Sequence, residues 1–507
     1  MSKKIISIEN LSKTSSKLKA KGKSIVLCHG VFDLLHIGHI KHFKEAKNLG
    51  DILIVTLTPD RFVNKGPSKP VFNEKLRLEA LAALDVIDFI ALNTSATAII
   101  PLQKLKPNIY CKGPDYKNHL NDISDQIKNE VDAVKKIEGK IIYTSDITFS
   151  SSKLLNRFGD IYTDQQKTLI NQIKKKYSFS KIKELIENLK NLKVLVIGEV
   201  IIDQYVFCEA LGKSGKEPVL VLKDLKMEKY LGGAGAICRH LSTFCKKITL
   251  LSMVGEKREF LSEIKKKLPK NIDFKYVKKT NSPTIVKKRY LDNLNRNKIF
   301  GIDTINDDFL NEKNEKYFSS LLRKNLSKHD LVIVSDYGHG LISNKNANLI
   351  CRLSKYLTLN AQVNAANIGY HSMRKYRNID CLIINEKEIR HEMRDKKNKI
   401  GPLMKKLSSD QNIKNIIVTM GIMGSKLYEK KNNRFYHCEA FTQTVVDKVG
   451  AGDSMLSVVA LGLKSNFDKN VVLLTGSLAA AKSVETIGNK EAINKIQLLK
   501  SFNHILK

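Results

Sequence analysis

The sequence predicts an α/β fold with at least two domains. The chain has 507 residues, which is too long for one ordinary hydrophobic core. Apolar runs of strand length alternate with segments whose apolar residues recur at helical spacing, an alternation typical of a parallel, doubly wound sheet. Glycine-containing turns that lead into helices lie in both halves, at residues 30–39 and 450–453. Each half is therefore expected to carry a ligand site at the carboxyl ends of its strands.

Composition is that of a globular protein. Hydrophobic residues make up 42% of the chain and charged residues 27%. No apolar run approaches the roughly 18 residues of a membrane helix, and the basic N-terminus lacks the apolar region of a signal peptide. The eight cysteines are scattered without a CxxC pair. We therefore expect a cytoplasmic protein with reduced thiols, no membrane partner and no zinc site.

The formal net charge of +36 has two explanations. One is a nucleic-acid-binding protein, whose lysines and arginines would neutralise phosphates. The other is a lysine-rich composition combined with anionic small-molecule substrates. The lysines are dispersed and no basic module studded with aromatic residues stands out, which favours the second explanation.

The first motif is GVFDLLHIGH, which runs from Gly30 to His39 and contains Phe32. It follows an apolar strand and precedes a helical pattern, so it is expected to be a strand, a tight loop and a helix start. His36 and His39 are three residues apart, and both imidazoles can face one point. The amide groups and the dipole of the helix N-terminus favour an anion at that point. The motif therefore predicts a polyphosphate site.

Further elements of this half follow in βα order. Asn73 is expected to cap a helix that carries Arg77, and Lys112 stands beside Gly113 on a loop where a ligand could approach. Ser150 to Ser152 precede an apolar helix, where they could cap the helix or bind phosphate. Apolar strands are predicted within residues 25–27, 51–60, 86–92 and 139–144, and a short helix is expected to end before residues 107–116.

The first half resembles the cytidylyltransferase-like nucleotidyltransferases. The resemblance rests on four motifs in the same order: GVFDLLHIGH, the Arg77 helix, the KGPDY sequence after residue 111 and the serine motif. The resemblance implies a Rossmann-like domain that transfers a nucleotidyl group from CTP or ATP to a sugar or polyol phosphate, with Mg²⁺ on the triphosphate. It implies catalytic roles for His36 and His39. It implies nucleotide or phosphate contacts for Gly30, Phe32, Arg77, Lys112, Ser151 and Ser152.

The two halves are expected to be joined by helices. Residues 1–158 form the predicted first domain, 159–190 a helical connection, and 191–507 the second domain. Leucines and isoleucines of the connection recur at helical spacing, with an interruption near residues 177–180. Two helices are therefore predicted there.

The second motif is GAGD at residues 450–453. The small residues Gly450, Ala451 and Gly452 allow the amides of a helix N-terminus to surround an anion. Asp453 stands at the same helix end, where its carboxylate could accept a proton. A tight packing turn is the alternative for this motif taken alone.

Together with INEKE, VTMGIMG and SDYGHG, the GAGD motif resembles the ribokinase-like (PfkB) sugar kinases. The resemblance implies an α/β/α domain with a small β lid at 204–223 and 284–300, through which relatives often form homodimers. It implies that Asp453 is the base and residues 450–452 the anion hole. Asn385 and Glu388 would organise Mg²⁺ and phosphates, with Glu388 as the metal ligand, and Asp203, Gly232 and Gly233 would bind sugar. The two halves together resemble bifunctional heptose kinase/adenylyltransferases with reversed domain order.

Four positions depart from the kinase pattern. Ala236 replaces a sugar-binding Asn, Glu199 replaces an Asp, and His339 replaces a Lys. A usually charged segment reads Val-Asn-Ala-Ala at residues 363–366. Because the proposed base and anion hole remain, altered sugar specificity is favoured. The alternatives are a kinase-like domain that binds sugar without catalysis and a nucleic-acid-binding protein.

Overall fold

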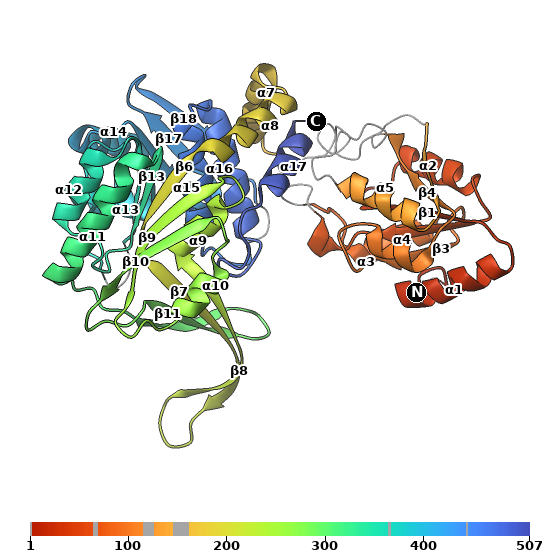
Figure 1. Cartoon of the computed structure of the whole chain (residues 1–507), viewed down its shortest axis with the longest axis horizontal. Helices are drawn as coiled ribbons and strands as arrows, with labels where there is room; N and C mark the ends of the chain where they lie inside the picture. Colours follow the sequence, from red (N-terminus) through yellow and green to blue (C-terminus); the bar gives the residue numbers. More distant parts are fainter. Residues whose placement is uncertain are drawn as a thin grey trace. The chain divides into compact units, whose positions relative to one another are not determined.

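The computed structural model describes residues 3–63, 69–114, 126–145, 162–363, 367–442 and 445–506. The chain forms two compact units (Figure 1). The N-terminal unit comprises Met1–Asp164 with Leu499–Lys507, and the C-terminal unit comprises Gln165–Leu498. The predicted boundary at residue 158 lies outside the described residues.

The N-terminal unit contains a five-stranded sheet of order β3-β2-β1-β4-β5. All its neighbouring strands are parallel, which confirms the predicted doubly wound sheet. The strands are β1 (Ile25–Gly30), β2 (Ile52–Leu57), β3 (Phe89–Leu92), β4 (Ile109–Lys112) and β5 (Lys140–Tyr143). The helices are α1 (Ile8–Ala20), α2 (Ile37–Lys47), α3 (Glu74–Ala82), α4 (Ile99–Leu105) and α5 (Gln126–Lys136).

Alternate residues of β1 serve two cores on opposite faces of this sheet. Ile25 and Leu27 pack in a cluster with residues of α1, α4 and α5. Val26 and Cys28 pack in a second cluster with residues of α2 and α3. The continuous apolar run of β1 is therefore explained by burial on both faces. This arrangement fixes α2, which carries the histidine motif, against one face.

Two helices follow in the chain, α7 (Asp164–Lys176) and α8 (Phe179–Asn188). Ser178 caps the second helix by accepting the N–H of Lys181. No helix of the described ranges combines the length and the apolar character needed to cross a membrane.

The C-terminal unit contains a nine-stranded sheet of order β10-β9-β6-β13-β14-β15-β16-β17-β18, in which only the pairings of β17 are antiparallel. Its strands are β6 (Lys193–Gly198), β9 (Lys247–Gly255), β10 (Ile272–Lys279), β13 (Leu331–Asp336), β14 (Leu357–Ala361), β15 (Cys381–Asn385), β16 (Asn415–Thr419), β17 (Ser425–Glu429) and β18 (Arg434–Cys438). The helices around it are α9 (Ala234–Leu241), α10 (Leu261–Lys267), α11 (Glu312–Asn325), α12 (Asn344–Leu353), α13 (Glu386–Met393), α14 (Ile400–Gln411), α15 (Ala451–Lys464) and α16 (Lys469–Ser483), followed by α17 (Lys495–Ile505).

A separate four-stranded sheet of order β12-β11-β7-β8 forms the predicted lid. Its strands are β7 (Val200–Lys213), β8 (Leu220–Gly233), β11 (Val286–Asp292) and β12 (Lys298–Thr304). The lid is longer than the predicted segments. The β7–β8 hairpin projects away from the rest of its unit (Figure 1). Large apolar side chains are exposed on this hairpin at Leu211, Val219, Leu220, Val221, Leu225 and Met227.

Candidate active sites

The two histidines of the first motif lie together at the start of α2. His36 is the N-cap, and its Nδ1 accepts the N–H of Gly38 at 3.1 Å. The rings of His36 and His39 stack with centroids 3.9 Å apart. Both rings therefore lie at one helix N-terminus, as the motif predicts.

The loop between β1 and α2 shapes the surroundings of this pair. Phe32 has a φ of +46°, and its ring lies edge-on to His39 with centroids 5.5 Å apart. A Cβ at position 30 would stand 2.9 Å from the Phe32 ring, so Gly30 lets the ring fold back over the strand end. In the structure, Gly30 and Phe32 thus support His39.

Arg77 was expected to contact phosphate, but in the structure its guanidinium is bonded to groups of the protein. Its side chain is buried, and its guanidinium donates to the carbonyls of Val31, Thr58 and Phe72 and to the carboxylate of Asp60. These partners come from the loops that follow β1 and β2 and from the start of α3. Arg77 therefore ties these loops together, because a buried guanidinium is stable only when its N–H groups are satisfied.

Lys112 also differs from the expected exposed charge on a loop. It is the last residue of β4, it is buried, and its Nζ lies 2.9 Å from the carboxylate of Glu130. Glu130 also accepts the hydroxyl of Tyr110 and the N–H of Ala98. Burial opposes ionisation of Glu130, but Lys112 and the amide bond hold its pKa below the usual value. The positive charge of Lys112 thus compensates the negative charge of the buried Glu130 carboxylate.

His29, the residue immediately before the motif, also lies beside this site. Its ring nitrogens are hydrogen-bonded to the hydroxyls of Thr56 at 2.9 Å and Thr58 at 3.3 Å. Burial, with the charge of Lys112, lowers the pKa of His29 to about 4. A neutral imidazole therefore stands immediately before Gly30 at the end of β1.

Asp33 was overlooked although it belongs to the motif. Its carboxylate is buried and accepts the N–H groups of Val71 at 2.8 Å and Phe72 at 3.0 Å. The carboxylate thus fixes the chain that enters α3. The signal in the sequence is an acidic residue between apolar residues of the motif, because such a position is buried only when its carboxylate is hydrogen-bonded.

Some expected positions lie outside the described residues. They are Ser151 and Ser152 of the serine motif, the Asp-Tyr of KGPDY, and Asn364 to Ala366. Ala236, which departs from the kinase pattern, is buried in α9.

In the C-terminal unit, the GAGD motif forms the start of α15. Gly450 is the N-cap with a φ of +92°, and a Cβ there would stand 2.3 Å from Asn489 Oδ1. A Cβ on Gly452 would meet no atom within 4 Å. The N-cap is a glycine and supplies no side-chain hydrogen bond to the first turn. The helix N-terminus therefore borders open space at Gly452, which is compatible with a bound anion.

Asp453 lies one turn inside this helix and is buried. Tyr337, directly after β13, donates its hydroxyl to Asp453 Oδ1 at 3.1 Å. Burial raises the pKa of Asp453 to about 7; the Tyr337 bond opposes this shift and the charge of Asp203 adds to it. A carboxyl group with this pKa can accept a proton near neutral pH.

Asp203 on β7 lies at the boundary between the main sheet and the lid. Its carboxylate is paired with Arg289 at 2.6 Å, and Lys287 lies opposite it in the parallel register of β7 and β11. A Cβ at position 232 would stand 2.1 Å from Asp203 Oδ2. Gly232 therefore makes room for the carboxylate, which explains one glycine of the double-glycine motif.

Glu199 is fully buried behind this position. Its carboxylate accepts the N–H groups of Tyr337 at 3.0 Å and His339 at 3.3 Å. A Cβ on Gly233 would stand 2.4 Å from the Glu199 carbonyl oxygen, so the second glycine permits this close approach. Burial, with the negative charge of Asp336, raises the pKa of Glu199 to about 7.

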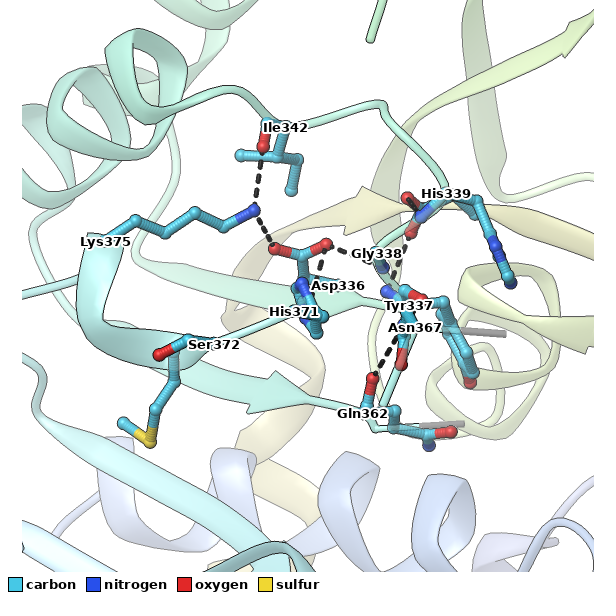
Figure 2. A network of polar contacts seen from close by, with 12 residues as sticks. Asp336, Tyr337, Gly338, His339, Ile342, Gln362, Asn367, His371, Ser372 and Lys375 are labelled. Atoms are coloured by element: carbon cyan, nitrogen blue, oxygen red, sulfur yellow. Dashed lines mark hydrogen bonds and ion pairs between the residues drawn. The ribbon is translucent and has the colours of Figure 1, made fainter. Parts of the chain in front are cut away.

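Figure 2 shows the polar network that holds the loop after β13. Asp336 accepts the N–H of Gly338 at 3.0 Å and the hydroxyl of Tyr376 at 2.7 Å. Lys375 bridges the Asp336 carboxylate, at 2.7 Å, and the carbonyl of Ile342, at 2.8 Å. The loop after β13 carries Tyr337, which contacts Asp453. The ion pair between Lys375 and Asp336 therefore holds this loop in place.

His339 stands where the family pattern has a lysine, but it does not supply a free positive charge. Its Nδ1 lies 2.7 Å from Asp307, and Lys279 donates to its carbonyl. Burial lowers the pKa of His339 despite the Asp307 bond.

Asn385 and Glu388 form a capping box at the start of α13. The Asn385 side chain accepts the N–H of Glu388 at 2.9 Å, and the Glu388 carboxylate accepts the N–H of Asn385 at 2.8 Å. Burial raises the pKa of Glu388 to about 7. The pair lies at the carboxyl end of β15, two strands along from β13 in the sheet.

Asp447 links the lid to the loop before α15. It accepts the hydroxyl of Tyr205 on β7 at 3.0 Å and is paired with Lys298 at the start of β12 at 2.6 Å. It also accepts the backbone N–H groups of Val449 at 3.1 Å and Gly488 at 3.0 Å. One carboxylate thus joins two lid strands to the segment that leads into α15.

The parallel sheet, the β lid and the helix N-terminus with its buried carboxylate define a ribokinase-like carbohydrate kinase unit. The model described as pfkB family carbohydrate kinase matches residues 191–496. The chain belongs to this family. A second model, Cytidylyltransferase-like, matches residues 27–185, which makes the N-terminal part a domain of that kind. Both resemblances stated from the motifs are thereby confirmed.

Similarity to curated proteins is concentrated in about a third of the chain. "Bifunctional protein HldE" of Trichlorobacter lovleyi is 34% identical over 168 residues, which is 32% of this chain and 32% of the relative. "Bifunctional protein HldE" of Campylobacter jejuni subsp. doylei is 40% identical over 160 residues, which is 31% of this chain and 32% of the relative. The matches thus span about a third of the length of these relatives.

Solved structures show the fold of the kinase part. Phosphofructokinase-2 from Escherichia coli in complex with potassium has a TM-score of 0.52 at 12% identity, covering 62% of this chain and all of that chain. The same protein in complex with fructose-6-phosphate has a TM-score of 0.50 at 13% identity, with the same coverage. At this identity the likeness establishes the fold alone.

Proposed function

We propose that the chain is a bifunctional sugar-activating transferase. The C-terminal unit phosphorylates a sugar with ATP, and the N-terminal unit transfers a nucleotidyl group from ATP or CTP to a sugar phosphate. The two family matches support this assignment, as do relatives named "Bifunctional protein HldE". By analogy with them, heptose-like precursors of surface polysaccharides are the proposed substrates.

The kinase proposal is carried by one observation, the position of Asp453 at the N-terminus of α15. Its carboxylate accepts the proton of the sugar hydroxyl, and that oxygen attacks the γ-phosphorus of ATP. ADP leaves, while the amides at residues 450–452 stabilise the charge on the transferred phosphoryl group. The pKa of Asp453, raised to about 7 by burial, suits this proton transfer at neutral pH.

Cations on the lid favour a phosphorylated sugar as the kinase substrate. Arg289 and Lys287 are alternate residues of β11, and both act electrostatically on Asp203. Burial lowers the pKa of Lys287, although the neighbouring carboxylates oppose this shift. Both cations are half-buried beside Asp203, and a substrate phosphate would accept hydrogen bonds from them.

Mg²⁺ enters both reactions as part of the nucleotide substrate. In the kinase, we assign Glu388 to the water shell of that ion. The capping box fixes its carboxylate at the end of β15, and Mg²⁺ usually keeps several of its waters. Asn385 then acts by holding Glu388.

In the N-terminal unit, His36 and His39 are assigned to the triphosphate. A phosphate oxygen of the sugar phosphate attacks the α-phosphorus, and pyrophosphate leaves. The stacked imidazoles donate hydrogen bonds to the phosphates, and the N-terminus of α2 adds its amides. Arg77 and Lys112 act indirectly, because both side chains are engaged within the protein.

A homodimer formed through the lid is also proposed. The β7–β8 hairpin exposes apolar side chains such as Leu220 at 53% and Leu225 at 45%. Exposed apolar surface gathered on one hairpin is typical of an interface. A second copy that offers the same hairpin would bury it symmetrically.

The test measures both products in the same samples. The chain is incubated with ATP or CTP and a panel of sugars and sugar phosphates, and ADP and pyrophosphate release are followed separately. Asp453→Asn is expected to abolish ADP release and to leave pyrophosphate release unchanged. The double variant His36→Ala/His39→Ala is expected to show the reverse. If the wild type forms no phosphorylated sugar across the panel, the kinase-like unit binds sugar without catalysis and the kinase proposal fails.

A further inference from the structure

Two thiols and an imidazole meet beneath the histidine motif. Cys28 on β1 and Cys111 on β4 are direct neighbours in the parallel register, and His42 lies on α2. One candidate ligand atom from each residue lies within 4.8 Å of the other two. Both cysteines are buried in the core cluster between the sheet and α2. The scattered cysteines predict no zinc site. The fold, however, brings these three residues together.

The spacing of this cluster suits a thiophilic ion. Zn–S bonds of about 2.3 Å and Zn–N bonds of about 2.0 Å place tetrahedral ligand atoms roughly 3.5–3.8 Å apart. The upper limit of 4.8 Å leaves about 1 Å to close, which χ1 rotations of less than about 20° at both cysteines together supply. Two thiolates and one imidazole are a donor set that selects zinc over magnesium or calcium.

A neighbouring hydroxyl orients His42 for coordination. Thr144 Oγ1 lies 3.4 Å from the Lys112 carbonyl and 3.1 Å from His42 Nδ1. A carbonyl can only accept, so the Thr144 hydroxyl donates to it and accepts the Nδ1–H of His42. That tautomer leaves the lone pair of His42 on Nε2. Metal-bound histidines are characteristically held by such a bond to the other ring nitrogen.

The charges of the site are compatible with zinc. Burial, with the neighbouring Cys111, raises the pKa of the Cys28 thiol. Burial and Lys112 lower the pKa of His42 to about 4, so its imidazole is neutral at pH 7. Two thiolates would neutralise Zn²⁺, and a neutral centre is the form that a buried site tolerates. Binding therefore releases protons to solvent.

We propose that Cys28, His42 and Cys111 form a zinc site that fastens α2 to the strands β1 and β4. Three protein ligands leave one position for a water molecule. His42 lies three residues after His39 on the same helix, so the ion fixes the helix that carries the histidine pair. The site is independent of the proposed reactions, because none of its ligands is assigned to a substrate.

The test is metal retention by the full chain under reducing conditions. Protein stripped with a chelator receives Zn²⁺, is freed of loose ion by desalting, and is analysed by elemental mass spectrometry. About one ion per chain is expected. Cys28→Ser and Cys111→Ser should lose it. Thr144→Val should weaken zinc affinity about tenfold, as expected for a group that orients a ligand.

Cys351→Ser is the matched control, because this cysteine lies in the C-terminal unit and is partly exposed. It should retain zinc like the wild type. Substitution with Co²⁺ needs no variant: a thiolate-to-cobalt charge-transfer band must appear in the wild type. Absence of that band, or equal zinc retention by the Cys28→Ser/Cys111→Ser double variant, would overturn the proposal.

Discussion

Asp453 is a carboxyl group that its surroundings keep close to half-ionised at neutral pH. Its pKa of about 7 arises from burial and from the nearby charge of Asp203, and the Tyr337 hydroxyl moderates the shift. The lid cations and the network around Asp336 hold these groups in place. The proposed base is thus tuned by residues from the lid, β13 and α15 together.

The first prediction concerns the pH dependence of sugar phosphorylation. Only the ionised carboxylate of Asp453 accepts a proton, so kcat/KM should rise with pH and level off above an apparent pKa near 7. Below that value, the rate should fall about tenfold per pH unit. Steady-state ADP release between pH 5.5 and about 8.5 measures this profile. A profile that is flat down to pH 5.5 would assign the proton transfer to another group.

The second prediction concerns Arg77. Replacing it with Met leaves the Asp60 carboxylate and three carbonyls without their donor, so the N-terminal unit should lose about 2–4 kcal/mol of unfolding free energy. Urea unfolding followed by circular dichroism measures the loss. The exposed Arg61→Met is the control and should change stability by less than about 0.5 kcal/mol. If Arg77→Met is as stable as the wild type, Arg77 does not act by holding the loops together. A direct contact with phosphate would then be its role.

At the scale of elements, local sequence patterns predicted β1, β2, β3 and β5, the starts of α2, α3 and α15, and both glycine turns, but neither α1 nor β4. His36, Asn73 and Gly450 begin helices where their motifs indicate. These features depend on neighbours a few residues away. The predicted lid also appears, although its strands extend further than the motif residues.

Contacts between distant elements could not be predicted in this way. Lys112 meets Glu130 through the packing of α5 on the sheet, and Arg77 meets the loop that follows β1. The pairing of Cys28 with Cys111 depends on the register of β1 and β4. No periodic pattern in one sequence encodes which strand lies beside which.

The third prediction separates two roles of the α13 cap. Asn385→Ala and Asn311→Ala each remove the N-cap of a helix, and each should cost about 1 kcal/mol of stability. Because Asn385 holds Glu388, only Asn385→Ala should also raise the KM for MgATP in the kinase reaction. If the KM for MgATP is the same in the two variants, the INEKE motif serves only as a helix cap.

At the scale of the whole molecule, each compact unit carries its own proposed site, and the lid carries the surface proposed for association. The fourth prediction concerns that surface. Leu220→Glu/Leu225→Glu places two charges on the exposed hairpin and should convert a dimer to monomers in analytical ultracentrifugation. Met423→Glu changes an exposed apolar residue elsewhere in the unit and should leave the mass unchanged. A wild-type monomer at micromolar concentration would contradict the dimer.

Asp447 has a thermodynamic consequence that extends beyond its own hydrogen bonds. It is bound to two lid strands and also to the backbone at Val449, before α15, and at Gly488, after α16, so movement of the lid is coupled to the segment that leads into α15. A ligand that stabilises the closed lid then also stabilises the conformation of the α15 N-terminus, where the nucleotide is proposed to bind. By linkage, sugar should tighten ATP by the same factor as ATP tightens sugar. The two substrates should therefore act as reciprocal effectors of one another, and Asp447→Asn should reduce both effects equally.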